Sequence, residues 1–317
     1  MMKNKILNLA YIGTGNISNF HIPAFRKAGF HISSISSRKN SKNLIKFAKK
    51  QNIKNIIPDW NDLLELTDEY DAIMIAAETK ITASILEKTL KTKKPILVEK
   101  PVSNNSEIIK KLVNKNQNNI FVAYNRRHYQ STQFAKKFVD SKPFVFANFT
   151  LPESTHQSLY QNGCHVIDLL NYFFQDKKLE YISPIMSGKK QSGFISIFKT
   201  KRGDIINMIS NWKSPSNFKI EFIYKNEKIE MSPIEKAYFY NGLTVVEPDK
   251  NNVVRRYVPN LIKESKKEMY EKTLKPGFLS QAKLFYNFVK NKKYDHRLCT
   301  LKQAVEVIKT IEQLAPK

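Results

Sequence analysis

Near the N-terminus stand Ile6-Leu7-Asn8-Leu9-Ala10-Tyr11-Ile12 and, directly after them, Gly13-Thr14-Gly15-Asn16-Ile17-Ser18. A short apolar run that ends in glycine is typical of a buried parallel strand. The positions that follow are spaced as one face of a helix, and Gly29 ends that helix: Ile17, Phe20, Ala24, Phe25 and Ala28. His21, inside this helix, is predicted to be structural.

The order strand, glycine turn, helix predicts a dinucleotide-binding fingerprint. Gly13 permits the tight turn, Gly15 lets the backbone approach a pyrophosphate, and the helix start at Asn16 and Ile17 offers free N–H groups to the anion. The third position of the pattern is Ser18 rather than Gly or Ala. The alternative is a tight strand-to-helix turn that holds no ligand.

The first 124 residues continue to alternate between the two periodicities. We expect further strands at 32–36, 71–77, 95–98 and 120–124, with helices at 44–50, 82–90 and 107–113. Strands that alternate with helices over short loops imply a parallel sheet with right-handed crossovers. The fold class is therefore α/β, with an N-terminal doubly wound Rossmann domain at 1–124.

The rhythm changes after Tyr124. Four segments are predicted as strands with no helix between them, at 144–151, 193–199, 204–212 and 218–231, and two amphipathic helices follow at 280–291 and 300–314. Period-two alternation along 218–225 fits an antiparallel sheet with one buried face. We expect a second domain at 125–317, of α+β type, with a large, mostly antiparallel open sheet.

Composition limits the partners. The 317 residues include 53 Lys+Arg and 28 Asp+Glu, a formal net charge of +25, and Lys accounts for 45 of the basic residues. Nucleic-acid binders cluster basic residues and favour Arg, whereas these lysines are scattered, so DNA or RNA is not expected as the main ligand. A lysine-biased proteome or steering of a polyanionic small molecule explains the charge. No apolar run reaches about 18 residues, so no membrane span is expected.

Two cysteines, Cys164 and Cys299, are too few for a disulfide framework, which favours a reducing, cytoplasmic setting. Two lone cysteines and scattered histidines predict no metal site.

The end of the second predicted strand bears on the cofactor. An acidic residue there would hold the ribose 2′-OH of NAD, but the chain reads Ser36-Ser37-Arg38-Lys39. A hydroxyl followed by two cations suits a 2′-phosphate, which Arg38 can grip with two hydrogen bonds. Ser37, Arg38 and Lys39 therefore favour NADP over NAD. The alternative is an ordinary solvated loop in a lysine-rich protein.

Further motifs resemble one family. Val98-Glu99-Lys100-Pro101 follows a predicted strand, Asn125-Arg126-Arg127 stands at the predicted domain junction, and Gly163-Cys164-His165-Val166-Ile167-Asp168-Leu169-Leu170 comes later. With the dinucleotide fingerprint they resemble, over nearly the whole chain, the Gfo/Idh/MocA oxidoreductases, the relatives of glucose–fructose oxidoreductase and inositol dehydrogenase.

The resemblance implies an NAD(P)-dependent dehydrogenase or reductase that moves hydride between nicotinamide and a carbinol or carbonyl carbon of a sugar, cyclic polyol or nucleotide sugar. In the family the lysine of Glu-Lys-Pro lies beside the nicotinamide and the reacting carbon, which here implies Lys100. His165 matches the proton-transfer histidine, and Asp168, three residues later, is expected to orient it. Ala76, Ala77 and Glu99 are expected along the cofactor.

Substrate binding is less clearly specified. Arg126 and Arg127 end the last predicted strand of the first domain, where ligands of such sheets bind, although one of the two is expected to be structural. His156, Tyr160, Gln161 and His165 complete the candidates, together with Lys100. The family also implies a homodimer or homotetramer.

Two departures leave an alternative open. Many active members carry Asp where this chain has Gln161, and their Thr-Pro-Asn stretch reads Ala77-Glu78-Thr79 here. The alternative function is a non-catalytic dinucleotide- or sugar-binding sensor on the same fold.

Overall fold

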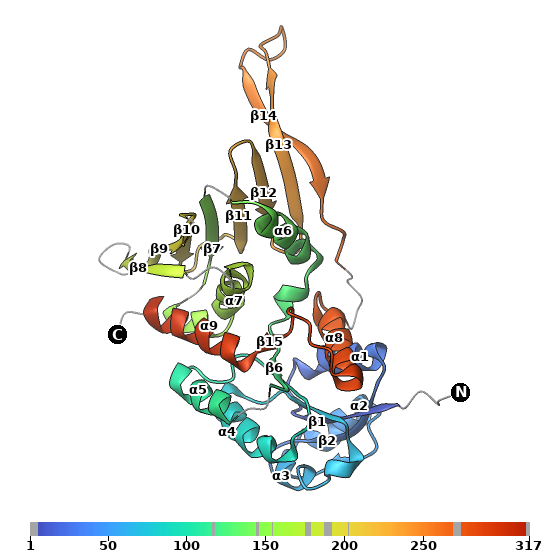
Figure 1. Cartoon of the computed structure of the whole chain (residues 1–317). Coiled ribbons are helices and arrows are strands. Elements are labelled where there is room, and N and C mark those ends of the chain that lie inside the picture. The colour runs from blue at the N-terminus through green and yellow to red at the C-terminus, as the bar shows by residue number, and fades with distance from the viewer. Residues whose placement is uncertain are drawn as a thin grey trace. The chain divides into compact units, whose positions relative to one another are not determined.

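The computed structural model describes residues 6–115, 118–143, 146–153, 155–174, 179–186, 192–201, 203–268 and 274–314 (Figure 1). The chain forms two compact units. The first comprises Met1–His128 with Met269–Thr310, and the second comprises Tyr129–Glu268 with Ile311–Lys317. The described residues 274–310 thus belong to the first unit, although the sequence predicts them to be part of the second domain. The division between 124 and 125 stays a prediction.

Among the described residues, seven strands form the sheet of the first unit in the order β15-β6-β5-β4-β1-β2-β3. The strands are β1 (Leu7–Ile12), β2 (Phe30–Ser36), β3 (Ile56–Ile57), β4 (Ala72–Ile75), β5 (Ile96–Val98), β6 (Ile120–Val122) and β15 (Cys299–Thr300). All pairs are parallel except β15 with β6. The order β3-β2-β1-β4-β5-β6 is that of a Rossmann sheet and reverses direction between β1 and β4. The predicted fold class is confirmed for this unit.

Helices cover this sheet, and their ends follow from local chemistry. They are α1 (Ser18–Ala28), α2 (Leu44–Lys50), α3 (Trp60–Leu63), α4 (Thr79–Thr89), α5 (Ser106–Asn114) and α8 (Phe278–Asn291), with short 3₁₀ turns η1 (Thr67–Glu69), η2 (Leu90–Thr92) and η3 (Asn125–His128). Gly29 ends α1 with φ 110°, a left-handed conformation that suits glycine. Asn105 begins α5 by accepting the N–H of Glu107 at 2.9 Å.

The C-terminal helix α8 lies beside α1 on the first sheet (Figure 1). Phe285 of α8 packs edge-on against Phe25 of α1 and Phe121 of β6, with ring centroids 6.4 and 6.3 Å apart. These rings are fully buried, so the return of the chain completes the core of the first unit. The last helix, α9 (Leu301–Leu314), follows β15.

The second unit contains an eight-stranded sheet of the order β14-β13-β12-β11-β7-β10-β9-β8 in its described part. Its strands are β7 (Phe146–Leu151), β8 (Leu179–Met186), β9 (Gly193–Thr200), β10 (Ile205–Asn211), β11 (Lys219–Ile223), β12 (Glu227–Met231), β13 (Ala237–Val246) and β14 (Arg256–Glu264). Only β10 with β7 pairs in parallel among these described pairs. The expected large, mostly antiparallel sheet is confirmed.

Two helices pack on one face of this second sheet, α6 (Gln130–Ser141) and α7 (Gly163–Phe174), and the short turn η4 (His156–Tyr160) precedes α7. Phe173 of α7 meets Phe222 of β11 at 4.9 Å between ring centroids. The expected run of strands without an intervening helix is therefore wrong, because α7 separates β7 from β8. Nearly all of α7 is buried, so its sequence is apolar on every side and lacks the periodicity that marks a surface helix.

Candidate active site

A groove of about 570 Å³ opens where β1, β2 and β4 end, at the point where the strand order reverses. Ligands of open α/β sheets bind at this position. The groove is lined by Ile12, Gly13, Thr14, Gly15, Ile17, Ser37, Arg38, Ser41, Asn43, Trp60, Ala76, Ala77, Glu78, Ile81, Ser84 and Ile85. Seven predicted cofactor residues thus meet there: Gly13, Gly15, Ile17, Ser37, Arg38, Ala76 and Ala77.

The two fingerprint glycines act differently. Gly13 has φ 121°, and a Cβ at this position would lie 2.1 Å from the carbonyl oxygen of Ala76, so only glycine lets β1 end this close to β4. A Cβ on Gly15 would meet no atom within 4 Å. The space over Gly15 is therefore open to a ligand phosphate.

The start of α1 faces the same turn. Its first turn contains no acidic residue, and no side chain caps it within the described structure. The N–H groups of Ser18, Asn19 and Phe20 donate to the turn carbonyls of Gly15, Asn16 and Ile17 at 3.0–3.1 Å, so the positive end of the helix dipole is what remains for an anion from outside the helix. Asn16, next to Gly15, is exposed. These residues fit the pyrophosphate of a dinucleotide.

The far end of the groove carries Ser37 and Arg38, which follow β2, and Ser41 and Asn43, which precede α2. The Asn43 side chain donates to the carbonyl oxygen of Thr14 at 3.2 Å and so ties this end to the glycine turn. Lys39 is exposed and does not line the groove as described.

Trp60 also lines the groove, and the sequence analysis missed it. It begins α3, where Asp59 caps the helix by accepting the N–H of Asn61 at 2.8 Å. The ammonium group of Lys88 lies 5.2 Å from the Trp60 ring centroid. An indole in the wall of a polar groove offers a flat face for an aromatic base. No local sequence pattern predicts this role, because Trp60 follows β3, and only the pairing of β3 with β2 brings it to the groove.

Glu99 and Lys100 directly follow β5, the neighbour of β4. The backbone N–H of Glu99 donates to the carbonyl oxygen of Ile75 at 2.8 Å, which holds the Glu-Lys-Pro motif against the end of β4. The Glu99 carboxylate contacts His21 of α1 at 2.5 Å and accepts the backbone N–H of Lys100 at 3.0 Å. Neither Glu99 nor Lys100 is among the residues that line the described groove.

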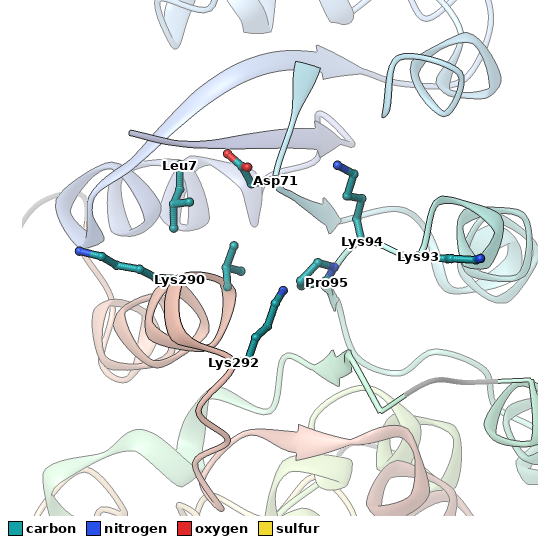
Figure 2. A pocket seen from close by; sticks show the side chains of 8 residues that line it. Leu7, Asp71, Lys93, Lys94, Pro95, Lys290 and Lys292 are labelled. Carbon is teal, nitrogen blue, oxygen red and sulfur yellow. The ribbon is translucent and has the colours of Figure 1, made fainter. Parts of the chain in front are cut away.

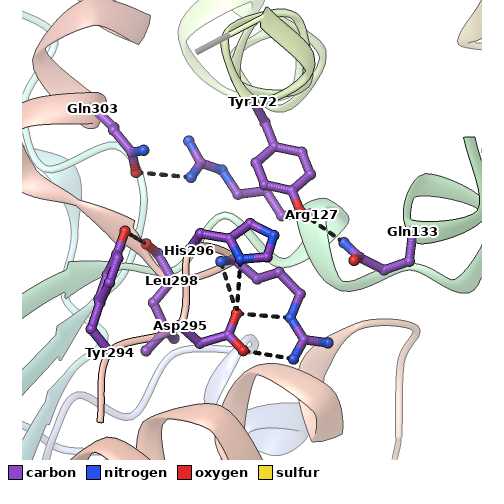
Figure 3. Close-up of polar contacts among 9 residues, drawn as sticks. Arg127, Gln133, Tyr172, Tyr294, Asp295, His296, Leu298 and Gln303 are labelled. Carbon is purple, nitrogen blue, oxygen red and sulfur yellow. Dashed lines mark hydrogen bonds and ion pairs between the residues drawn. The ribbon is translucent and has the colours of Figure 1, made fainter. Parts of the chain in front are cut away.

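The predicted junction motif forms η3. Arg127 is only 1% exposed, and its Nη1 donates to Oε1 of Gln303 at 2.9 Å (Figure 3). That oxygen also accepts the N–H of Thr300, so the buried guanidinium helps to hold the start of α9. Asn125 donates to the carbonyl oxygen of Pro276 at 3.0 Å. Arg126 is half-buried.

His128, the last residue of η3, is buried, and neither ring nitrogen has a hydrogen-bond partner among the described residues. Burial, and then the guanidinium groups of Arg127 and Arg297, lower the pKa of His128 to about 3. Next to it, Arg297 forms two hydrogen bonds with Asp295, at 2.8 and 2.7 Å (Figure 3), and lowers the pKa of Asp295 to about 2.

The remaining candidates belong to the second unit. His165 and Asp168 lie in α7, one helical turn apart, and are 7% and 0% exposed. Tyr160 is half-buried, which raises its pKa, and Gln161 beyond it is exposed. His156 begins η4, and its side chain lies outside the described residues. The roles of all these residues stay predictions.

A second hollow, of about 370 Å³, lies at the amino ends of the strands of the first sheet (Figure 2). Leu7, Asp71 and Pro95 mark those strand ends, and four lysines surround them: Lys93, Lys94, Lys290 and Lys292. Lys290 and Lys292 stand at the end of α8, where cations offset the helix dipole. Two of its four lysines have this structural explanation, and the hollow lies at the opposite sheet edge from the glycine turn.

The comparisons with known proteins agree with this geometry. The sequence model of the Gfo/Idh/MocA family, described as an oxidoreductase family with an NAD-binding Rossmann fold, matches residues 7–142. The similarity to the Gfo/Idh/MocA oxidoreductase family is thus shown for residues 7–142. The match covers the groove, the Glu-Lys-Pro motif and η3. The resemblance inferred from the motifs is thus confirmed, and the chain carries an NAD-binding Rossmann fold of an oxidoreductase family.

Solved structures extend the likeness of fold over nearly the whole chain. An oxidoreductase from Thermotoga maritima is 20% identical with a TM-score of 0.75, covering 98% of this chain and 96% of that one. Myo-inositol dehydrogenase from Lactobacillus casei, in complex with NAD(H) and myo-inositol, is 15% identical with a TM-score of 0.75, covering 98% and 93%. UDP-N-acetylglucosamine 3-dehydrogenase from Acidithiobacillus ferrooxidans is 13% identical with a TM-score of 0.72, covering 97% and 96%. No curated protein matches the chain by sequence.

Two further properties bear on the site. Cys164 and Cys299 are both buried thiols, and their Sγ atoms lie 3.3 and 3.5 Å from the carbonyl oxygens of Gln161 and Thr300. In the described part of the chain, no cluster of three or more His, Cys, Asp or Glu side chains is arranged to hold a metal ion. Every described helix is too short or too polar to span a bilayer.

Proposed function

We propose that this protein is an NAD(P)-dependent dehydrogenase or reductase that acts on a carbinol or carbonyl carbon of a sugar, cyclic polyol or nucleotide sugar. The observation that carries the proposal is the groove where the strand order reverses. There, the close approach of Ala76 leaves room only for glycine at position 13, and the space over Gly15 is open. Glu-Lys-Pro follows the adjacent strand β5. Solved structures of similar fold include a cyclic-polyol dehydrogenase and a nucleotide-sugar dehydrogenase.

The nicotinamide, when bound, accepts or supplies the hydride with its electron pair. In the oxidative direction, Lys100 hydrogen-bonds the substrate oxygen and stabilises the negative charge that develops as the C–H bond breaks. His165 accepts the hydroxyl proton, and Asp168 orients its imidazole. Arg126 supplies a cation for a substrate carboxylate or phosphate. Arg127, buried against Gln303, serves the structure.

The role of Lys100 is tested by Lys100→Ala and Lys100→Arg. Loss of an oriented charge at the reacting oxygen is expected to lower kcat by about 10²–10³-fold while dinucleotide affinity changes little. Lys100→Arg keeps the charge but changes its geometry, so it should retain more activity than Lys100→Ala. Turnover of Lys100→Ala within a few-fold of wild type would refute the assignment.

NADP is the proposed cofactor, supported by Ser37 and Arg38 in the groove wall and by the absence of an acidic residue from Ser36 to Lys39. Arg38→Ala removes a charge-assisted hydrogen bond, worth about 1.5–3 kcal/mol, or roughly 10–100-fold in affinity. NADPH binding should weaken by this factor, with NADH binding unchanged. Lys39→Ala is the matched control, because Lys39 carries the same charge but stands outside the described lining.

A parallel titration with NADPH and NADH, followed by a screen of polyols, sugars and nucleotide sugars, separates this proposal from its alternative. Dinucleotide binding together with hydride transfer supports the enzyme. Tight binding without hydride transfer to any of these classes would favour the sensor, and binding of neither dinucleotide would refute both. A cytoplasmic location stays part of the proposal, and the two buried thiols are compatible with a reducing compartment.

Self-association is also proposed, and the hairpin β13–β14 supports it. Strand β12 pairs with β13 only along Ala237–Asn241, whereas β14 pairs with β13 out to Val246. The outer part of the hairpin is therefore a two-stranded ribbon, which is visible at the top of Figure 1. Such ribbons are marginally stable by themselves in water. This one needs a partner surface.

The exposed side chains of the β13–β14 hairpin also support a partner surface. Eight apolar residues on it are each 44–83% exposed: Leu243, Val245, Val253, Val254, Tyr257, Val258, Leu261 and Ile262. Val245 pairs with Tyr257 and Leu243 with Pro259, so Leu243, Val245 and Tyr257 share one face of the ribbon and form an exposed apolar strip on it. We assign the occupant as a second copy of this chain.

Val245→Glu with Tyr257→Glu tests this in sedimentation equilibrium. Wild type should be a dimer or larger, and the double variant should be monomeric with unchanged dinucleotide affinity. Ile45→Glu is the control, since Ile45 is 60% exposed on α2. A monomeric wild type at concentrations of about 100 μM would overturn the assignment.

A further inference from the structure

A buried histidine and a buried glutamate meet beneath the candidate site. Nε2 of His21 lies 2.5 Å from Oε1 of Glu99, with side chains 3% and 11% exposed. The residues are 78 positions apart in sequence, on α1 and directly after β5. Because an ionised carboxylate only accepts hydrogen bonds, Nε2 is the donor.

The second carboxylate oxygen of Glu99 is also engaged. Oε2 accepts the backbone N–H of Lys100 at 3.0 Å. One carboxylate therefore joins the imidazole of His21 to the main chain of the lysine in Glu-Lys-Pro. A carboxylate held at both oxygens has little freedom to turn, so its position fixes the backbone from which Lys100 extends.

The imidazole is itself held in place. Its ring lies 4.7 Å from the Phe278 ring and stacks on Phe25 at 5.9 Å, between centroids. Tyr11, buried on β1, lies near the same carboxylate, and burial together with the negative charge of Glu99 raises its pKa. Burying a carboxylate is costly unless its hydrogen bonds are satisfied. An apolar pair would fill this core at lower cost, so the polar pair calls for an explanation beyond packing.

We propose that His21 and Glu99 are positioning residues that set Lys100 at the reacting carbon. The inference rests on the role of Lys100 in the proposed function. Helix α1, which carries His21, begins at the glycine turn of the groove, so the contact ties the position of Lys100 to the element that binds the pyrophosphate. A shift of about 1 Å in a catalytic group can cost on the order of 10²-fold in rate.

The kinetic test compares His21→Leu, His21→Gln and Phe25→Leu. His21→Leu leaves Oε1 of Glu99 without its donor, and kcat should fall about 10–100-fold with the KM for the dinucleotide changed little. His21→Gln restores an N–H donor and should recover most of the lost kcat. Phe25→Leu disturbs the same aromatic cluster without touching Glu99, so it should lower Tm but not kcat.

A second measurement does not depend on activity. Trace acetylation followed by mass spectrometry gives the reaction rate of each lysine amine in the folded protein. In His21→Leu the rate at Lys100 should change by about threefold or more, whereas Lys91, exposed in the turn η2, should keep its rate. His21→Gln and Phe25→Leu should leave both rates close to wild type.

The outcomes separate this inference from the proposed function. An unchanged rate at Lys100 in folded His21→Leu would overturn the positioning role, whatever the enzyme does. A changed rate at Lys100, combined with full turnover of Lys100→Ala, would keep the positioning role and refute the catalytic one. Equal losses of kcat in His21→Leu and Phe25→Leu, without recovery in His21→Gln, would reduce His21 to a packing residue.

Discussion

The buried His128 should make the first unit sensitive to acid. The imidazole is neutral in the folded state, with a pKa near 3 against about 6.5 in the unfolded chain. The unfolded state therefore binds more protons below pH 6.5, and stability falls as pH falls toward 3. Each pH unit costs about 1.4 kcal/mol of unfolding free energy, so the loss is about 3 kcal/mol at pH 4.5 and about 4 kcal/mol near pH 3.

His128→Leu isolates this contribution. Because neither ring nitrogen has a partner among the described residues, the substitution leaves no polar group unpaired, and stability at pH 7.5 should change by less than about 1.5 kcal/mol. Urea unfolding is followed by Trp60 fluorescence in a Trp212→Phe background, which reports on the first unit. Between pH 7.5 and 4.5 wild type should lose about 3 kcal/mol more of its unfolding free energy than the variant. Parallel pH profiles would refute the argument that His128 is buried and neutral.

Three further results are expected. Gly13→Ala should lower the free energy of unfolding by more than about 2 kcal/mol and abolish dinucleotide binding, because the added Cβ has no room. Gly15→Ala should keep the wild-type thermal stability and weaken only dinucleotide binding. In Trp212→Phe, NADPH should change the fluorescence of Trp60, and an unchanged signal at saturation would place the dinucleotide elsewhere. Asp295→Asn should lower the free energy of unfolding by about 1 kcal/mol at neutral pH, where the ionised carboxylate pairs with the Arg297 guanidinium. The difference in stability between wild type and variant should shrink as pH falls toward 2, which acid unfolding curves measure.

The parallel sheet was predictable from sequence because its strands are short apolar runs bounded by glycine or proline. The observed β1 and β2 lie within about two residues of their expected bounds. Period-two patterning likewise predicted β11, whereas the predicted segment 218–231 divides into β11 and β12. Helix α7 was missed because it is buried on every side, so no polar face remained to show a period of 3.6 residues. The packing of α8 on α1 was missed because it joins distant segments.

The residues of the candidate site likewise fall into those that local sequence predicts and those that it does not. Gly13, Gly15, Ser37 and Arg38 were predictable because a turn and the strand end behind it are local in sequence. Trp60 was not, since strand order alone brings it to the groove. His21 was expected to be structural, and its contact with Glu99 joins residues 78 positions apart, which no local sequence pattern predicts.

Charge by itself is a poor guide to function in a chain with net charge +25. Four lysines gather around the hollow at the amino ends of the strands, where two of them offset the dipole of α8. The groove at the opposite edge has fewer cations but a left-handed glycine, open space for a phosphate and an uncapped helix start. Lysines on flexible stems attract any anion, whereas backbone N–H groups held by a turn recognise a phosphate in one place. High salt should therefore weaken non-specific anion binding far more than dinucleotide binding, and equal losses of both would show that charge rather than geometry selects the ligand.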